Sequence, residues 1–272
     1  MRFRPVFNNV QIIKEENVMD IIDFHTHPGY NTTKDFGYDM TPELFVGELK
    51  RAGITKACGS ALDLDFINNE PEIDVMIKKL NHIAWMYYGK FPDFFIPGIH
   101  IHPDCTETSA NEIEFYSRKG VKIVGELTPY LMNCDTFLSS GYFELFELCA
   151  QRNMILSLHR PPINECVSLA EQFPNLKIVI AHPSYGMDYM NVLSVIKKYE
   201  NLSMDLSGTG IAAYGMLRYG IDVVGKEKIL FGTDFPGYNP EMYVCSVLYE
   251  KLTDDEREFI LYKNAERLLT EN

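Results

Sequence analysis

The chain of 272 residues is long enough for one α/β barrel, although this length also permits two domains. Its composition, 46% hydrophobic and 23% charged, is ordinary for a soluble globular protein. The formal net charge of −13 argues against a nucleic-acid partner, because phosphate binding uses a surplus of Lys and Arg. There is no apolar run long enough for a membrane span, no secretory signal and no Cys-x-x-Cys pair. We therefore expect a cytoplasmic protein with free thiols and no membrane association.

The first 18 residues differ from the rest of the chain. The segment Gln11–Asn17 is polar and shows no clear periodicity, and a second methionine, Met19, directly precedes the first apolar run. We therefore predict an N-terminal extension over residues 1–18 and one domain over residues 19–272. A natural start at Met19 is the alternative.

Short apolar, β-branched runs alternate with helical patterns along the chain, which is typical of βα units and a parallel sheet. Eight strands are predicted, over Ile21–His25, Ile54–Leu62, Phe94–His102, Val121–Leu127, Met154–His159, Leu176–His182, Leu202–Leu206 and Lys228–Thr233. Helix starts lie between them, such as the capping pattern Thr253–Glu256. The prediction is an α/β fold, a (β/α)8 TIM barrel in a single domain. An open doubly wound sheet is the alternative, but no G-x-G-x-x-G follows the first strand.

Ionisable side chains gather at the C-terminal ends of these strands, where barrel enzymes place their chemistry. His25 and His27 are two residues apart at the end of the first strand, so both point to one face. Four further strands each end in one residue of a metal-ligand type, namely Glu126, His159, His182 and Asp234. One such residue is often only a cap or a hydrogen-bond partner, but convergence from five strands predicts a divalent-metal site.

These residues resemble the amidohydrolase superfamily and, within it, the amidohydrolase-2 group, over roughly Met19–Leu269. The order of the H-x-H pair, the two later histidines and the aspartate is the pattern of the superfamily. Phe231–Pro236 looks like the strand-eight signature of the group, and Asn264–Leu269 looks like its closing helix. The resemblance implies a metal-dependent enzyme that acts on a small molecule.

The fourth strand departs from many binuclear relatives, which carry a carboxylated lysine there. Here the strand ends in Gly125-Glu126, and Lys122 lies too early in it. A glutamate at this place is similar to the metal-bridging Glu of TatD-type deoxyribonucleases, whereas many amidohydrolase-2 members bind one metal. One or two ions are therefore expected, zinc first and manganese as the alternative. Glu126 is either a bridge or a carboxylate that contacts ligands or substrate.

The resemblance also implies roles in catalysis. Asp234 would bind metal and carry a proton, and His182 would either contact the water or substrate carbonyl or bind a second metal. Substrate contacts are predicted for Arg160, Tyr130 and His102, with a salt bridge elsewhere as the alternative for Arg160. Because barrels of this kind are commonly homo-oligomers, self-association is compatible with the sequence.

The leading functional prediction is hydrolysis of a small amide, lactone or ester-like substrate by a metal-activated water. The alternative is a metal-dependent decarboxylase, a lyase of a small unsaturated or aromatic acid, because the same metal and aspartate serve both reactions. A barrel that only binds a ligand would not need this ligand set, and a DNA phosphodiesterase fits the negative charge poorly.

Overall fold

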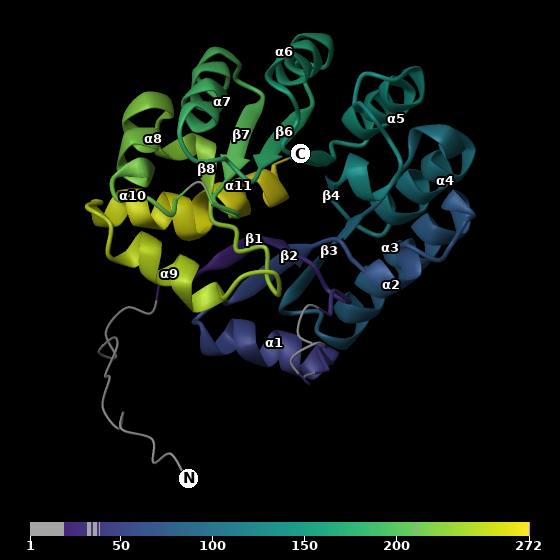
Figure 1. Ribbon diagram of the computed structural model, residues 1–272, viewed down its shortest axis with the longest axis horizontal. Coiled ribbons are helices and arrows are strands. Elements are labelled where there is room, and N and C mark those ends of the chain that lie inside the picture. The colour runs from purple at the N-terminus through teal and green to yellow at the C-terminus, as the bar shows by residue number, and fades with distance from the viewer. Residues whose placement is uncertain (1–18, 32–33, 35–36, 38, 210, 272) are drawn as a thin grey trace.

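The computed structural model describes residues 19–31, 34, 37, 39–209 and 211–271, so the predicted extension over residues 1–18 lies outside the described residues. In the described part, eight parallel strands follow one another in chain order around a nearly closed barrel (Figure 1). They are β1 (Ile22–Thr26), β2 (Lys56–Gly59), β3 (Phe95–Ile99), β4 (Ile123–Leu127), β5 (Ile155–His159), β6 (Lys177–Ala181), β7 (Leu202–Asp205) and β8 (Ile229–Leu230). The predicted single-domain (β/α)8 barrel is confirmed.

Helices follow the strands and form the outer layer (Figure 1). They are α1 (Pro42–Arg51), α2 (Leu64–Ile67), α3 (Ile73–Lys90), α4 (Thr106–Ser117), α5 (Ser140–Gln151), α6 (Ile163–Gln172), α7 (Met187–Lys198), α8 (Met216–Val224), α9 (Pro240–Leu248), α10 (Asp254–Glu258) and α11 (Asn264–Thr270). The sequence encodes several of their starts, as at Thr253, where the predicted capping box with Glu256 forms.

Two apolar cores hold the barrel, and the smaller one decides where a ligand can enter. The larger core lies mainly between the strands and the surrounding helices. The smaller core joins buried strand residues such as Phe24, Ile155 and Val179 with Ala265 and Leu268 of α11. Because α11 packs against these interior side chains, that end of the barrel is filled, and the open end is the one where the strands finish.

Buried polar contacts, rather than a continuous ladder, close the barrel between β1 and β8. The Asp234 amide donates to the His25 carbonyl over 2.8 Å. Asp23 is fully buried, and its carboxylate accepts from the Thr233 hydroxyl at 2.6 Å and from the Thr233 amide at 3.0 Å. Burial raises the pKa of Asp23 to about 7, although the hydrogen bonds from Thr233 act against that rise. This clamp fixes the segment that carries Asp234 against the strand that carries His25.

Replacing Thr233 by Val should therefore lower the free energy of unfolding by about 1–3 kcal/mol, because it leaves a buried carboxylate oxygen without its hydroxyl donor. Chemical denaturation would measure the change. Thr270→Val on α11 is the control, since the Thr270 hydroxyl bonds only to exposed helix carbonyls and its loss should cost less than about 0.5 kcal/mol. Equal stabilities of the two variants would contradict the clamp.

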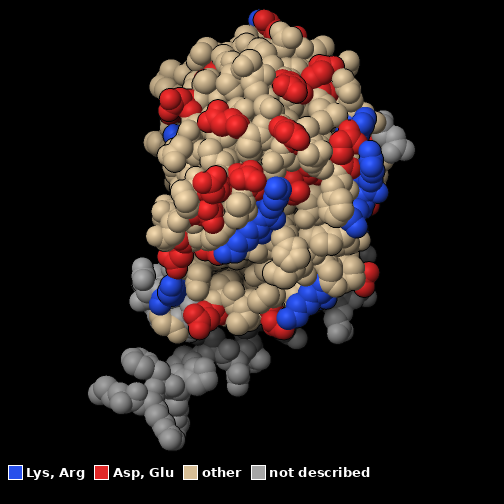
Figure 2. Space-filling view, turned by 90° about the vertical axis from the view of Figure 1, so that its right-hand side faces the viewer, with Lys and Arg blue, Asp and Glu red and all other residues tan. Residues whose placement is uncertain are grey.

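The surface of the described residues does not by itself point to a function. None of the described helices is long and apolar enough to cross a membrane. One face of the molecule shows many scattered acidic side chains and fewer basic ones (Figure 2). The six cysteines are all free thiols in the structure.

Candidate metal centre and active site

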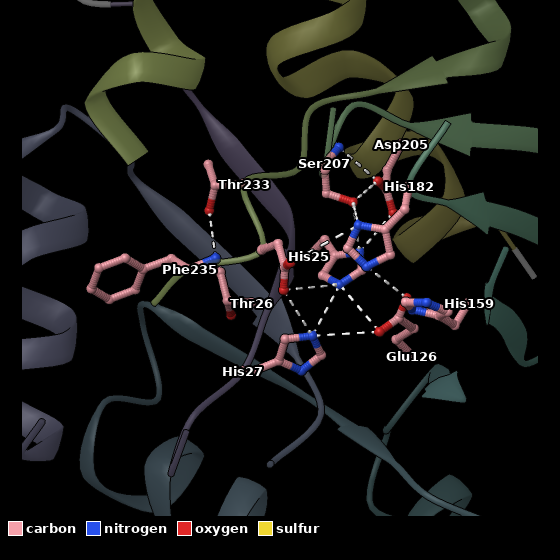
Figure 3. A network of polar contacts seen from close by, with 12 residues as sticks. His25, Thr26, His27, Glu126, His159, His182, Asp205, Ser207, Thr233 and Phe235 are labelled. Carbon is pink, nitrogen blue, oxygen red and sulfur yellow. Dashed lines mark hydrogen bonds and ion pairs between the residues drawn. The ribbon is translucent and has the colours of Figure 1, made fainter. Parts of the chain in front are cut away.

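Side chains from the ends of β1, β4 and β8 form the first half of a polar cluster at the open end of the barrel (Figure 3). The Nε2 atoms of His25 and His27 lie 3.1 Å apart. Glu126 places Oε2 3.6 Å from His25 Nε2 and 3.5 Å from His27 Nε2. Asp234 Oδ1 lies 3.8 Å and 3.2 Å from the same two nitrogens. Two nitrogens and two carboxylate oxygens thus surround one point.

The other oxygen of Glu126 faces the histidines from β5 and β6. Glu126 Oε1 lies 2.9 Å from His159 Nδ1 and 3.0 Å from His182 Nε2. All six residues that the sequence predicts as ligands therefore meet. They do so as three overlapping groups: Glu126 with the H-x-H pair, Glu126 with His159 and His182, and Asp234 with His25 and His182.

Hydrogen bonds to the far side of the H-x-H rings test whether this set fits a cation. His25 Nδ1 lies 2.8 Å from Asp205 Oδ2, and His27 Nδ1 lies 3.1 Å from the Ser60 carbonyl oxygen. Both partners only accept, so each neutral ring carries its proton on Nδ1 and a lone pair on Nε2. Two lone pairs that face each other across 3.1 Å repel unless a cation lies beside them. The residues therefore fit a divalent metal ion.

The carboxylates of the cluster need a positively charged partner all the more because the site is buried. Glu126 is buried, which by itself raises its pKa, but the charges of His25 and His182 and the hydrogen bonds from the histidines hold it well below its usual range. Burial likewise favours neutral His27, yet hydrogen bonds to Asp234 and Glu126 raise its pKa to about 9. Buried carboxylates of this kind require a partner cation, either a protonated histidine or a metal.

The backbone adopts left-handed conformations just where three of the predicted residues follow their strands. Arg160, His182 and Asp234 have φ angles of 39°, 57° and 60°. Such angles are uncommon outside glycine and gather at functional sites. At Arg160 this conformation breaks the alternation expected of a strand, so Arg160 and His159 line the same cavity instead of pointing apart.

A cavity of about 400 Å³ opens above the cluster. Glu126, His27 and Asp234 line it together with His159 and His182, and Tyr30, Tyr130, Tyr238 and Arg160 contribute further lining. The Tyr130 ring lies 5.0 Å from the ring of His159. Burial and the charges of Glu126 and Asp234 raise the pKa of the Tyr130 phenol, which keeps the hydroxyl protonated as a donor. Among the described residues, none forms an ion pair with Arg160, so the predicted alternative of a salt bridge is not observed.

His102 is not brought to this cavity. It is fully buried; its Nε2 lies 2.7 Å from the Met132 carbonyl oxygen, and its Nδ1 accepts from the Asp104 amide. Both ring nitrogens are thus engaged in holding the loops after β3 and β4. The geometry gives the predicted substrate contact of His102 no support, because β3 ends at Ile99 and His102 lies beyond it as the N-cap of the short turn Pro103–Cys105.

Three polar residues around the cluster were not predicted. Asp205 ends β7 and bonds to His25, Ser207 follows it, and Asp23 lies two residues before His25 on β1. Asp23 could have been noticed in the sequence as a carboxylate in an apolar strand, two residues before the H-x-H pair. Asp205 is a strand-end carboxylate of the kind that identified Asp234, but it belongs to a strand that contributes none of the predicted ligands.

Residues 22–270 match the amidohydrolase family. The chain belongs to this family. The likeness to solved structures concerns the fold: a 2,6-dihydroxybenzoate decarboxylase bound to 2,6-dihydroxybenzoate has 15% identity over 92% of this chain and 98% of that one, with a TM-score of 0.72. A 5-carboxyvanillate decarboxylase from Sphingomonas paucimobilis has 14% identity over 92% of this chain and 99% of that one, with a TM-score of 0.69.

A dihydroxybenzoic acid decarboxylase from Polaromonas sp. JS666, with bound manganese and the inhibitor 2-nitroresorcinol, has 15% identity over 93% of this amidohydrolase and 97% of its own chain, with a TM-score of 0.67. No curated protein matches the chain.

Proposed function

We propose that this amidohydrolase is a metal-dependent decarboxylase of a small aromatic or unsaturated carboxylic acid. The observation that carries the proposal is Arg160, an exposed residue that lines the cavity of the metal-ligand cluster and has no ion pair among the described residues. Arginine suits bidentate recognition of a carboxylate. The decarboxylases of similar fold add support. We therefore favour decarboxylation over hydrolysis, which was the leading prediction from the sequence.

His25, His27 and Asp234, with Glu126, would hold a divalent cation. When bound, it would act as a Lewis acid that polarises an oxygen of the substrate. Imidazole and carboxylate donors suit both Zn²⁺ and Mn²⁺. The manganese in the decarboxylase from Polaromonas makes Mn²⁺ the first ion to try.

Asp234 is the carboxylate of the cluster that a substrate can reach. Its side chain is 16% exposed, whereas that of Glu126 is 2% exposed. We assign Asp234 as the proton carrier. Its carboxylic acid form gives the proton to the substrate carbon that bears the carboxylate; the bond from that carbon to the carboxylate then breaks, carbon dioxide leaves and the electron pair stays with the substrate. Solvent reprotonates Asp234.

The size and lining of the cavity fit a single-ring acid. A volume of about 400 Å³ lies at the low end of small-molecule sites. Tyr30, Tyr130 and Tyr238 offer aromatic faces beside the polar floor. Carbon dioxide release from 2,6-dihydroxybenzoate and related hydroxybenzoates, by the Mn²⁺-loaded protein, tests the proposal. Turnover of esters, lactones or amides with no carbon dioxide from any acid would contradict it.

Hydrolysis remains the second candidate, and the position of Glu126 favours it. One Glu126 oxygen faces His25 and His27 and the other faces His159 and His182, as a carboxylate between two cations would. The number of ions discriminates between the candidates: two per chain favour the hydrolase and one favours the decarboxylase.

Substitution of Arg160 by Met should raise the KM for an acid substrate by about 10- to 100-fold with a smaller change in kcat, because a charged hydrogen bond to the bound anion is lost. Arg118→Met is the matched control, since Arg118 is exposed on the surface and pairs with Glu114. Steady-state kinetics on the active acid gives the answer. An unchanged KM in Arg160→Met would remove Arg160 from substrate binding.

A further inference from the structure

A chain of hydrogen bonds behind the cluster ties its two halves to one buried carboxylate. Asp205 and Ser207 are both fully buried at the end of β7. The Ser207 hydroxyl donates to Asp205 Oδ1, and Asp205 Oδ2 accepts from His25 Nδ1 at 2.8 Å. Ser207 Oγ also lies 3.3 Å from His182 Nδ1 and 3.2 Å from His25 Nδ1 (Figure 3).

The direction of these bonds follows from the acceptors. Asp205 can only accept, so the single hydroxyl proton of Ser207 goes to Asp205. The lone pairs of Ser207 Oγ then accept the Nδ1 proton of His182. His182 Nδ1 also lies near Asp234, but that separation is 3.9 Å and too long for a hydrogen bond. Ser207 is thus the acceptor within reach of this nitrogen in the described structure.

The backbone next to Ser207 allows its close contact with His182. Gly208 follows Ser207 with φ +73°, and a Cβ atom there would lie 2.8 Å from His182 Nδ1. A side chain at this position would push the imidazole out of place. The Gly208 carbonyl accepts from the Tyr243 hydroxyl, which anchors the turn to α9. The Ser207-Gly208 turn therefore lies close against His182.

We propose that Ser207 is a positioning residue for the metal centre. It fixes His182 in the tautomer that keeps a lone pair on Nε2, 3.0 Å from Glu126 Oε1, and it links that ring to the carboxylate that orients His25. The hydrogen bonds from His182 to Ser207, from Ser207 to Asp205 and from His25 to Asp205 form a relay at the end of β7. This relay holds the two halves of the cluster in one geometry. The inference rests on the proposed metal centre and adds residues to which no role has been given.

The test compares Co²⁺ binding in the wild type, Ser207→Ala and Ser203→Ala. Ser203 lies on β7, is buried and is not hydrogen-bonded to a histidine in the described structure, so Ser203→Ala controls for loss of a buried hydroxyl. Equilibrium dialysis gives the affinity, and the visible absorption of bound Co²⁺ reports the ligand geometry independently of catalysis. Asp205→Asn breaks the same relay and serves if Ser207→Ala does not fold.

Ser207→Ala is expected to bind Co²⁺ about 10- to 100-fold more weakly, with an altered visible spectrum, while Ser203→Ala matches the wild type. If Ser207→Ala, or Asp205→Asn in its place, matches the wild type in both affinity and spectrum, the relay is overturned. If the wild type itself binds no Co²⁺, the metal centre of the proposed function fails, which is a separate result from failure of the relay.

Discussion

Asp234→Asn should lower kcat by about 10²- to 10⁴-fold while the protein keeps most of its bound cation. The amide preserves the volume of the side chain and an oxygen that can face His25 and His27, from which Asp234 Oδ1 lies 3.8 Å and 3.2 Å. It cannot carry a proton to the substrate, so the chemical step loses its acid. The effect should appear in kcat rather than in KM, because Asp234 is assigned to proton transfer and Arg160 to binding.

Steady-state kinetics together with elemental analysis of the same sample separates these effects. Asp222→Asn is the control, since Asp222 is an exposed carboxylate that pairs with Arg218 on α8. Full activity in Asp234→Asn would exclude Asp234 as the proton carrier. Loss of the metal together with activity would instead make Asp234 chiefly a ligand.

Glu126→Gln should weaken divalent-metal binding by at least about 10-fold and lower kcat with it. Glu126 lies within 3.6 Å of nitrogens from four histidines, and its charge is what the buried site offers a cation at its centre. The glutamine amide keeps the shape but removes that charge, and its NH₂ group would point at one pair of histidines as a donor. Isothermal titration with Mn²⁺ measures the loss.

Glu165→Gln is the matched control, because Glu165 is also a buried glutamate but accepts hydrogen bonds from Thr136 and the Phe137 amide on α6's side of the barrel. It should bind Mn²⁺ as the wild type does. If Glu126→Gln binds Mn²⁺ with wild-type affinity, the carboxylate does not belong to the metal centre.

The sequence predicted the barrel and the convergence of the six candidate ligands because both depend on periodicity. Alternation within a buried strand puts His25 and His27 on one face, and parallel βα units bring all strand ends to one side. Those rules need no knowledge of packing. They give the identity of the residues that meet, but not the distances between them.

Conformations at single residues could not be predicted in the same way. Arg160 adopts a positive φ angle, so it shares a cavity with His159 although strand alternation predicts that the two point apart. His102 was expected to contact substrate, yet β3 ends at Ile99 and His102, just before a short turn, bonds to the Met132 carbonyl in the packing between loops. Both outcomes depend on the backbone just beyond a strand, where periodicity no longer applies.

The hydrogen-bond partners of the candidate ligands also could not be predicted from the sequence pattern. Asp205 touches His25 across 180 positions of chain, and Ser207 reaches His182 across 25. A serine or an aspartate at a strand end is common, and only its distance to a ring nitrogen gives it a role. Likewise, only the coordinates show that one oxygen of Glu126 faces the H-x-H pair and the other faces His159 and His182.

The most direct test of the proposed metal centre is the metal content per chain of the purified protein after equilibration with Mn²⁺ and removal of free ions. We predict at least one tightly held divalent ion per chain. Removal of that ion with a chelator should abolish activity, and added Mn²⁺ or Zn²⁺ should restore it. A chain that holds no divalent ion under these conditions would contradict the metal centre and the catalysis proposed from it.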